Sequence, residues 1–259
     1  MPQDARFDGP VRIAAADGET IASLDDWGRL GAPAGGSRQW SPGRSAMEEA
    51  RAWMGLAPVL ALLDSHSAAR GTSLGLVTPE ARLALDEFRG NTRNTDVLAY
   101  GQAAAGALVL GVEAKVDEPF DERSLGDVVA DPREGSRLPE RVDQLCQRLF
   151  GRPLRQDQGL DPKLVELPYQ LLHGPIAVAL EAERAGAAVA VFAVHEIRTD
   201  AADDRKHDRN ATDWERLWMA LDVPPPADGQ LSDVPLADPA DVTLLAGKAV
   251  SDLRGAPAG

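Results

Sequence analysis

Apolar and polar residues alternate along the stretch ALVLGVEAKVDE, which runs from Ala107 to Glu118. Its even-numbered positions 108 to 116 are all apolar, whereas Glu113 and Lys115 occupy odd-numbered ones. A period of two with aliphatic and β-branched residues predicts a strand that is partly or wholly buried. The preceding TDVLAYG predicts a second strand, and the short QAAAG between the two suits a hairpin.

The rest of the chain shows further helical and extended patterns. Apolar residues spaced three to four apart predict helices, which are expected at residues 45–53, 139–150, 164–185 and 213–221. The third is expected to be interrupted at Gly174-Pro175, because proline removes a backbone donor. Apolar runs predict strands at residues 82–88, 187–195 and 242–250, and residues 118–136 are expected to be mostly loop.

These elements follow the order helix, three-strand meander, helices and a further buried strand. That order predicts a mixed α/β fold with a central mixed sheet flanked by helices. Residues 1–36 are expected to be a lead segment with a short strand and a helical turn at Ser23–Leu30, ending in the loop GAPAGGS. Residues 37–254 are expected to form a single α/β domain, and residues 255–259 a frayed tail.

Composition narrows the class of protein. Of the 259 residues, 44% are hydrophobic and 26% are charged, which is ordinary for a folded globular protein. No run approaches about 18 apolar residues, and the amino terminus lacks a signal-peptide pattern, so a cytoplasmic protein without membrane contact is expected. Cys146 is the only cysteine, which excludes an internal disulfide and a cysteine-based zinc cluster. Its place in an amphipathic run predicts a core residue.

The charge of the chain is strongly negative and unevenly distributed. A formal net charge of −14 argues against broad nonspecific contact with nucleic acid, whose affinity comes largely from neutralised phosphates. Between Arg133 and Lys163, however, seven basic residues outnumber five acidic ones. This segment is a candidate basic rim for contact with DNA or RNA, and exposed helix faces of mixed charge are the alternative explanation. The sequence leaves open a protein partner and the oligomeric state.

Glu113 and Lys115 are two residues apart in a predicted strand, so their side chains leave the same face. A carboxylate and an ammonium are costly to bury in an apolar strand unless a partner or a function uses them. Only four lysines occur in the chain, and this one lies in the run with the strongest strand pattern. Asp96 begins the preceding strand, where a hairpin brings it beside Glu113. The alternative explanation is an ion pair on the solvent side of an antiparallel strand.

The usual nucleotide and metalloprotease fingerprints GxGxxG, GxxxxGK[ST] and HExxH are absent. The predicted order of elements, with Asp96 and the triplet Glu113-Ala114-Lys115, resembles the PD-(D/E)XK nuclease-like superfamily. Its core is a helix, a three-strand meander, a helix and a further strand, and the two motifs look like its acidic residue and its E-x-K element. Glu48 stands where many members carry a first-helix glutamate, with Glu49 as the next choice.

Other blocks of the sequence extend the resemblance. Tyr169-Gln170 resembles the glutamine-and-tyrosine helix of the subset related to RecB nucleases. SLDDWGRL, GRSAMEEARAW, TDVLAYG, VEAKVDEPF and YQLLH look like an uncharacterised bacterial family placed in that superfamily, and all of them lie within about Ser23 to His195. Two features depart from the pattern. Thr95 replaces the proline that names the superfamily, and the acidic overall charge is unusual for a nuclease.

The resemblance implies metal-dependent hydrolysis of phosphodiester bonds. It implies that Asp96 and Glu113, with the Ala114 carbonyl, hold Mg²⁺ or Mn²⁺, since hard cations take oxygen ligands. Lys115 is expected to orient the attacking water or to stabilise the transition state as a point charge.

Glu48 and Gln170 complete the implied site. The resemblance implies that Glu48 holds a water bound to the metal. The alternative is that Glu48 forms a capping box with Ser45, which is a sufficient structural reason for a glutamate at this position. Gln170 is expected to hold the substrate or a ligand, and ordinary helix packing is the alternative for it and for Tyr169 and His173. Two other functions stay open: a catalytically inactive nuclease-fold interaction module, and a hydrolase of a small phosphate compound.

Overall fold

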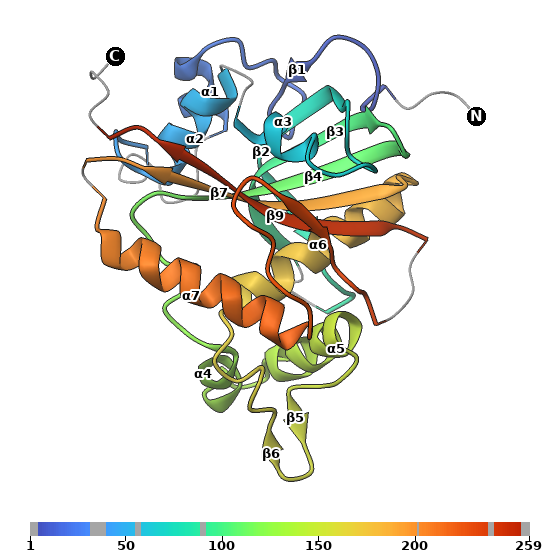
Figure 1. The fold of residues 1–259 in the computed structure, drawn as a ribbon, viewed down its shortest axis with the longest axis vertical. Coiled ribbons are helices and arrows are strands. Elements are labelled where there is room, and N and C mark those ends of the chain that lie inside the picture. Colours follow the sequence, from blue (N-terminus) through green and yellow to red (C-terminus); the bar gives the residue numbers. More distant parts are fainter. Residues whose placement is uncertain are drawn as a thin grey trace.

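A seven-stranded mixed sheet crosses the middle of the protein (Figure 1). The computed structural model describes residues 5–31, 40–54, 58–88, 92–200, 202–237 and 241–254. Within them the strands of this sheet lie in the order β1-β2-β3-β4-β7-β9-β8. Their bounds are β1 Arg12–Ile13, β2 Ser73–Ala84, β3 Thr92–Ala103, β4 Gly106–Lys115, β7 Val189–Arg198, β8 Leu231–Asp233 and β9 Thr243–Asp252. A separate small hairpin consists of β5 (Arg155–Gln156) and β6 (Gly159–Leu160).

The sheet joins an antiparallel half to a parallel half. Strands β2, β3 and β4 form the meander, in which Val97 pairs with Val112. β7 and β9 continue the sheet parallel to β4, while β8 pairs antiparallel with β9 and β1 parallel with β2. Parallel neighbours need long crossover connections, and helices lie in all three of the crossovers here. The mixed α/β fold predicted from the order of elements is confirmed.

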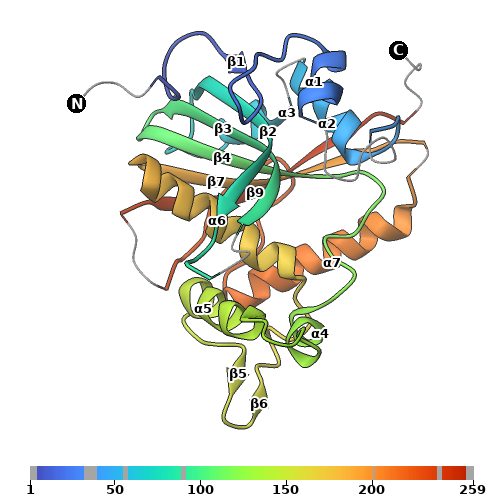
Figure 2. The same ribbon diagram turned by 180° about the vertical axis from the view of Figure 1, so that it is seen from behind.

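Helices cover both faces of the sheet (Figures 1 and 2). One face carries α1 (Leu24–Leu30), α2 (Ser45–Met54) and α3 (Pro58–Leu63), and the other carries α4 (Leu125–Ala130), α5 (Leu138–Phe150), α6 (Tyr169–Ala185) and α7 (Asp204–Ala220). Alternation along β4 divides the core in the same way. Leu110 and Val112 pack with α2 and α3, whereas Val109 packs with α6. Glu113 and Lys115 therefore lie on the α6 side of the sheet.

Some predicted boundaries were wrong. The first strand of the meander was expected at residues 82–88 but starts at Ser73, because Gly75 and Pro79 mask its apolar alternation. α6 begins at Tyr169 rather than at residue 164, and it runs through Pro175 without the expected interruption. Ten residues of α6 are buried. Their packing outweighs the hydrogen bond that the proline removes.

One helix was not predicted from the sequence, and another is longer than predicted. Residues 118–136 were expected to be loop, but they contain α4, which starts with a capping box of Ser124 and Asp127. α7 begins at Asp204 rather than at Asp213, because its first turns are polar and follow an N-cap at Asp203. The core position of Cys146 is as predicted. Most of the predicted loop GAPAGGS and the predicted tail lie outside the described residues.

Candidate active site

The α6 side of β4 carries the residues that the sequence singled out. The pairing of Val97 with Val112 places Asp96 beside Glu113, as expected of a hairpin. Asp96 Oδ2 accepts a hydrogen bond from the Ala114 backbone N–H at 2.7 Å, and Lys115 Nζ donates to Glu113 Oε1 at 2.9 Å. Lys115 is only 4% exposed. The ion pair therefore lies inside the protein and not on a solvent-facing strand.

α6 contributes contacts from above this face. Gln170 Nε2 donates to Glu113 Oε1 at 2.5 Å, and the Gln170 backbone N–H donates to Asp121 Oδ2 at 2.8 Å. Two donors, from Gln170 and Lys115, therefore fix the orientation of the Glu113 carboxylate. Oε1 of Gln170 is buried without a hydrogen-bond partner among the described residues. A buried acceptor of this kind fits a site in which a water or a substrate group supplies the donor.

β2 adds a carboxylate that the sequence analysis did not single out. Glu80 lies between Pro79 and Ala81, which pair with Val97 and Thr95, so it stands opposite Asp96, and its φ is +49°. Non-glycine residues rarely adopt a positive φ, so the backbone of β2 is distorted at this point. Asn94 Nδ2 donates to Glu80 Oε2 at 3.3 Å. The available sequence signal was Pro79, because a proline inside a strand often marks a bulge.

The carboxyl groups of the site crowd one another. Burial and the charge of Glu113 raise the pKa of Glu80 to about 7. Burial, followed by Glu113 and Glu80, raises the pKa of Asp96 well above its ordinary value. Burial alone would lower the pKa of Lys115, but Glu113, Asp96 and Glu118 raise it above its usual range. The site thus holds an ammonium and more carboxyl groups than cations.

Replacing Glu80 with glutamine is expected to stabilise the protein relative to wild type, by an amount that grows as the pH rises from 4.5 to about 7. In the folded protein the pKa of Glu80 is about 7, whereas its ordinary value is 4.5. Between these values the folded state binds a proton that the unfolded chain has released, so this group stabilises fully below pH 4.5 and loses its contribution as the pH rises through about 7. Glutamine cannot ionise, so the variant escapes this loss.

Chemical denaturation in the presence of a chelator, at several pH values, checks this expectation. The unfolding free energies of wild type and Glu80→Gln should diverge steadily with pH between the two pKa values. Glu87→Gln is the matched control, because Glu87 is an exposed glutamate in the segment that follows β2. A constant difference between wild type and Glu80→Gln at all pH values would contradict the raised pKa.

The polar contacts of Glu48 lie outside this site. α2 lies on the opposite face of the sheet, and among the described residues no hydrogen bond or ion pair joins Glu48 to β3 or β4. Glu48 Oε1 accepts hydrogen bonds from the Gly43 backbone N–H and from Arg51 Nη1, both at 2.8 Å. Ser45 is the first helical residue, and its hydroxyl donates to Glu118. The described contacts thus do not include the expected Ser45–Glu48 capping box, although Glu48 does bind a backbone N–H just before the helix.

Tyr169 and His173 pack within the core beside Gln170. Their ring centroids are 4.9 Å apart in an edge-to-face arrangement, and Arg93 Nη2 donates to the Tyr169 hydroxyl at 3.2 Å. Burial lowers the pKa of His173 to about 3, so its imidazole is neutral. The packing explanation therefore accounts for these two rings. Of the three α6 residues considered, Gln170 is the one that contacts Glu113.

Ion pairs neutralise most of the candidate basic rim. The pairs are Arg137–Glu140, Arg141–Asp86, Arg148–Glu183, Arg152–Asp161, Arg155–Asp143 and Lys163–Asp222. Because each of these cations faces a carboxylate, the segment forms surfaces of mixed charge and not a free basic surface. The structure thus gives no support to nucleic-acid binding through this rim.

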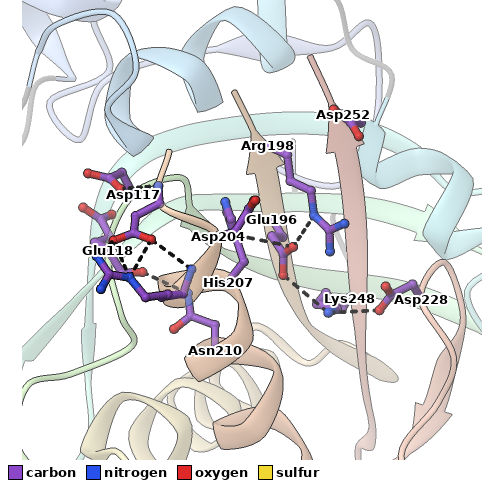
Figure 3. Close-up of polar contacts among 12 residues, drawn as sticks. Asp117, Glu118, Glu196, Arg198, Asp204, His207, Asn210, Asp228, Lys248 and Asp252 are labelled. Atoms are coloured by element: carbon purple, nitrogen blue, oxygen red, sulfur yellow. Dashed lines mark hydrogen bonds and ion pairs between the residues drawn. The ribbon is translucent and has the colours of Figure 1, made fainter. Parts of the chain in front are cut away.

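A second group of charges borders the site on β7 and β9 (Figure 3). Glu196, which pairs in register with Lys115, is only 1% exposed. It accepts a hydrogen bond from Arg198 Nε at 2.7 Å and lies 3.4 Å from Lys248 Nζ and 3.5 Å from His207 Nδ1. These contacts brace α7 against the sheet. Lys248 is thus a second buried lysine, and it pairs with Glu196 and not with Glu113.

The described residues contain no group of three or more His, Cys, Asp or Glu side chains arranged to hold a metal ion. Asp96 and Glu113 form a smaller pair. Mg²⁺ commonly binds to one or two carboxylates and keeps several waters, so a pair of this kind is compatible with it.

Comparison with known protein families identifies the chain as a family member. A family model described as Domain of unknown function (DUF6946) matches residues 20–252. The chain belongs to this family. The DUF6946 region includes Asp96, the whole of β4 and Gln170, so the candidate site lies within the shared domain. No curated protein and no solved structure matches the chain. Across the described part of the chain, every helix is too short or too polar to span a membrane.

Proposed function

We propose that this protein is a metal-dependent phosphodiesterase of the PD-(D/E)XK type that acts on nucleic acid. The observation that carries the proposal is the buried Lys115 ammonium, 2.9 Å from Glu113 and beside Asp96. A buried ion pair kept only for stability is expected to be balanced in charge. Here Glu80, Asp96 and Asp121 surround that pair with additional carboxyl groups.

The donor set suits Mg²⁺ or Mn²⁺. Burial and neighbouring carboxylates raise the pKa values of Asp96 and Glu80, which is the sign of negative charge without enough compensation. A divalent cation supplies that compensation. Asp96 and Glu113 offer carboxylate oxygens, the Ala114 carbonyl is a third candidate ligand, and waters complete the shell of such an ion.

The chemistry follows from the positions of the protein groups. A bound divalent ion acidifies a water and offsets charge on the phosphate. Lys115 stays protonated because the surrounding carboxylates raise its pKa, so it can donate to the attacking water or to a phosphate oxygen. Gln170 holds Glu113 in place through Nε2, and its unpartnered Oε1 can accept a hydrogen bond from water or substrate.

Calorimetric titration with Mn²⁺ is expected to show binding to wild type and none to the double variant Asp96→Ala plus Glu113→Ala. The two carboxylates are the charged ligands of the proposed site, so their removal leaves only neutral donors. The matched control is Asp228→Ala plus Asp233→Ala, which removes two exposed carboxylates from the β8 region. This control has the same change in net charge and should bind Mn²⁺ like wild type.

Binding that survives in the Asp96 and Glu113 double variant would contradict the proposed site. Absence of binding to wild type, with and without a nucleic-acid substrate, would instead favour a catalytically inactive interaction module with the same fold.

A small phosphate compound is a second candidate substrate. The specific observation in its favour is the pairing of the rim arginines with carboxylates on a chain of net charge −14. Long nucleic acids bind largely through free cations, whereas a small phosphate needs only the metal and Lys115. Hydrolysis of bis(4-nitrophenyl) phosphate without cleavage of single-stranded or duplex nucleic acid would favour this substrate class.

A further inference from the structure

A hydrogen-bonded chain joins Ser251, His195 and Glu49 on the α2 side of the sheet. The Ser251 hydroxyl Oγ lies 2.9 Å from His195 Nε2, and His195 Nδ1 lies 2.5 Å from Glu49 Oε2. The Trp53 indole N–H donates to Glu49 Oε1 at 2.6 Å. His195 is 0% exposed and Glu49 is 2% exposed, so this set of contacts fixes the imidazole in one orientation.

The partners of His195 determine which nitrogen carries the proton. An ionised carboxylate only accepts hydrogen bonds, so in the neutral ring Nδ1 holds the hydrogen that faces Glu49. Nε2 then presents its lone pair to the Ser251 hydroxyl. A hydroxyl next to a base, with the base oriented by a carboxylate, is the arrangement that activates a serine nucleophile.

Ser251 is the accessible end of this chain. It is partly exposed, whereas His195, Glu49 and Trp53 are buried. β8 pairs with β9 only as far as Gly247, so among the described residues no strand pairs with the outer edge of β9 at Ser251.

The same open edge offers a donor for a developing negative charge. The Leu253 N–H donates to the Arg198 carbonyl of β7. Because successive N–H groups of a strand alternate in direction, the Asp252 N–H points away from β7 and toward the open edge. This N–H belongs to the residue after Ser251, a position from which a backbone donor can stabilise an oxyanion.

We propose that Ser251 is the nucleophile of a second active site, which hydrolyses small esters. Ser251 Oγ bonds to the ester carbonyl carbon while its proton passes to His195 Nε2, and Glu49 stabilises the imidazolium. The bond from carbon to the leaving oxygen then breaks, and His195 returns the proton to the leaving alcohol. Water repeats the sequence on the acyl-serine and releases the acid. Because the ring of His195 is enclosed, only a compact acyl group suits this site.

The test uses the full chain with a fluorophosphonate probe and with 4-nitrophenyl acetate. Wild type is expected to carry the probe on Ser251, with fluoride released, as located by peptide mass spectrometry. Ser251→Ala should not be labelled in that peptide, and His195→Gln should be labelled about 100-fold more slowly. Both variants should lose ester hydrolysis to the same extent.

Ser73→Ala is the matched control. Ser73 is exposed and lies in the sequence Gly-Thr-Ser-Leu-Gly, which has the spacing of a serine-hydrolase motif, but it starts strand β2. This variant should be labelled like wild type. Asp96→Ala plus Glu113→Ala should also be labelled like wild type, so the outcome is separate from that of the metal site.

Two results would overturn the proposal: wild type that is not labelled at Ser251, or His195→Gln that reacts as fast as wild type. Circular dichroism establishes that each variant is folded. If His195→Gln does not fold, Glu49→Gln decides, because labelling of that variant as fast as wild type excludes a histidine base oriented by this carboxylate.

Discussion

Replacing Lys115 with methionine is expected to slow phosphodiester hydrolysis about a thousandfold and to leave Mn²⁺ binding in place. Methionine keeps most of the length and apolar volume of the side chain, but it lacks the ammonium that donates to Glu113 at 2.9 Å. The charge that stabilises the transition state is lost, while the carboxylates of Asp96 and Glu113 remain. The measurement is kcat/KM for bis(4-nitrophenyl) phosphate and for a single-stranded oligonucleotide in Mn²⁺.

Lys248→Met is a close control for that variant. Lys248 is also buried in the sheet, at 8% exposed, and it also pairs with carboxylates, at 3.4 Å from Glu196 and 3.1 Å from Asp228. Its removal carries the same change in charge and a similar cost in stability, but it lies outside the candidate site. Activity should stay near that of wild type. An equal loss in both variants would mean that buried charge supports the fold and that Lys115 has no separate role in the reaction.

Replacing Trp218 with alanine is expected to lower the free energy of unfolding by about 3–5 kcal/mol. Trp218 is 0% exposed, and its ring packs edge-to-face with Trp214 at a centroid distance of 5.6 Å. These two rings fill the core beneath α7, where alanine would leave a large cavity. Urea denaturation monitored by circular dichroism measures the change.

Met219→Ala tests whether the loss of stability comes from lost packing in the core or from a change in the propensity of α7 to form a helix. Met219 is the next residue of α7 and is 68% exposed. Its replacement should change the free energy of unfolding by less than about 0.5 kcal/mol, because alanine is a good helix former and little packing is lost. A Trp218 variant as stable as the Met219 variant would show that α7 is not packed on the sheet as described.

Much of this fold could be predicted because its strongest elements have simple patterns. The buried strand β7 is an almost continuous apolar run, and β4 has an apolar residue at every even-numbered position from 108 to 114. In the elements that were missed, some residues favour a helix or strand while others, such as proline and glycine, are typical of a break. Pro79 and Gly75 hide β2, Pro175 suggests a break in a helix that tertiary packing keeps intact, and the polar first turns of α7 carry little hydrophobic pattern.

The candidate site was predictable only where strand pairing determines it. Asp96, Glu113 and Lys115 come together because two adjacent strands form a hairpin, and such a local arrangement can be read from sequence. Glu80 joins them through a distortion of β2, for which Pro79 is the only signal in the sequence, and that signal does not give the direction of the Glu80 side chain. Ser251, His195 and Glu49 are far apart in the chain, so they come into contact only when β7 pairs with β9 and α2 packs on that part of the sheet.

The alternation of side chains along β4 and β7 has a consequence for the length of these strands. Neighbouring residues serve opposite faces: Lys115 points to the α6 side, while Ala114 and its register partner His195 belong to the α2 side. Inserting one residue in the middle of β4 would turn Glu113 and Lys115 into the apolar packing under α2 and α3, without replacing any side chain. The number of residues in this strand is therefore as strict a requirement for the site as their chemical identity.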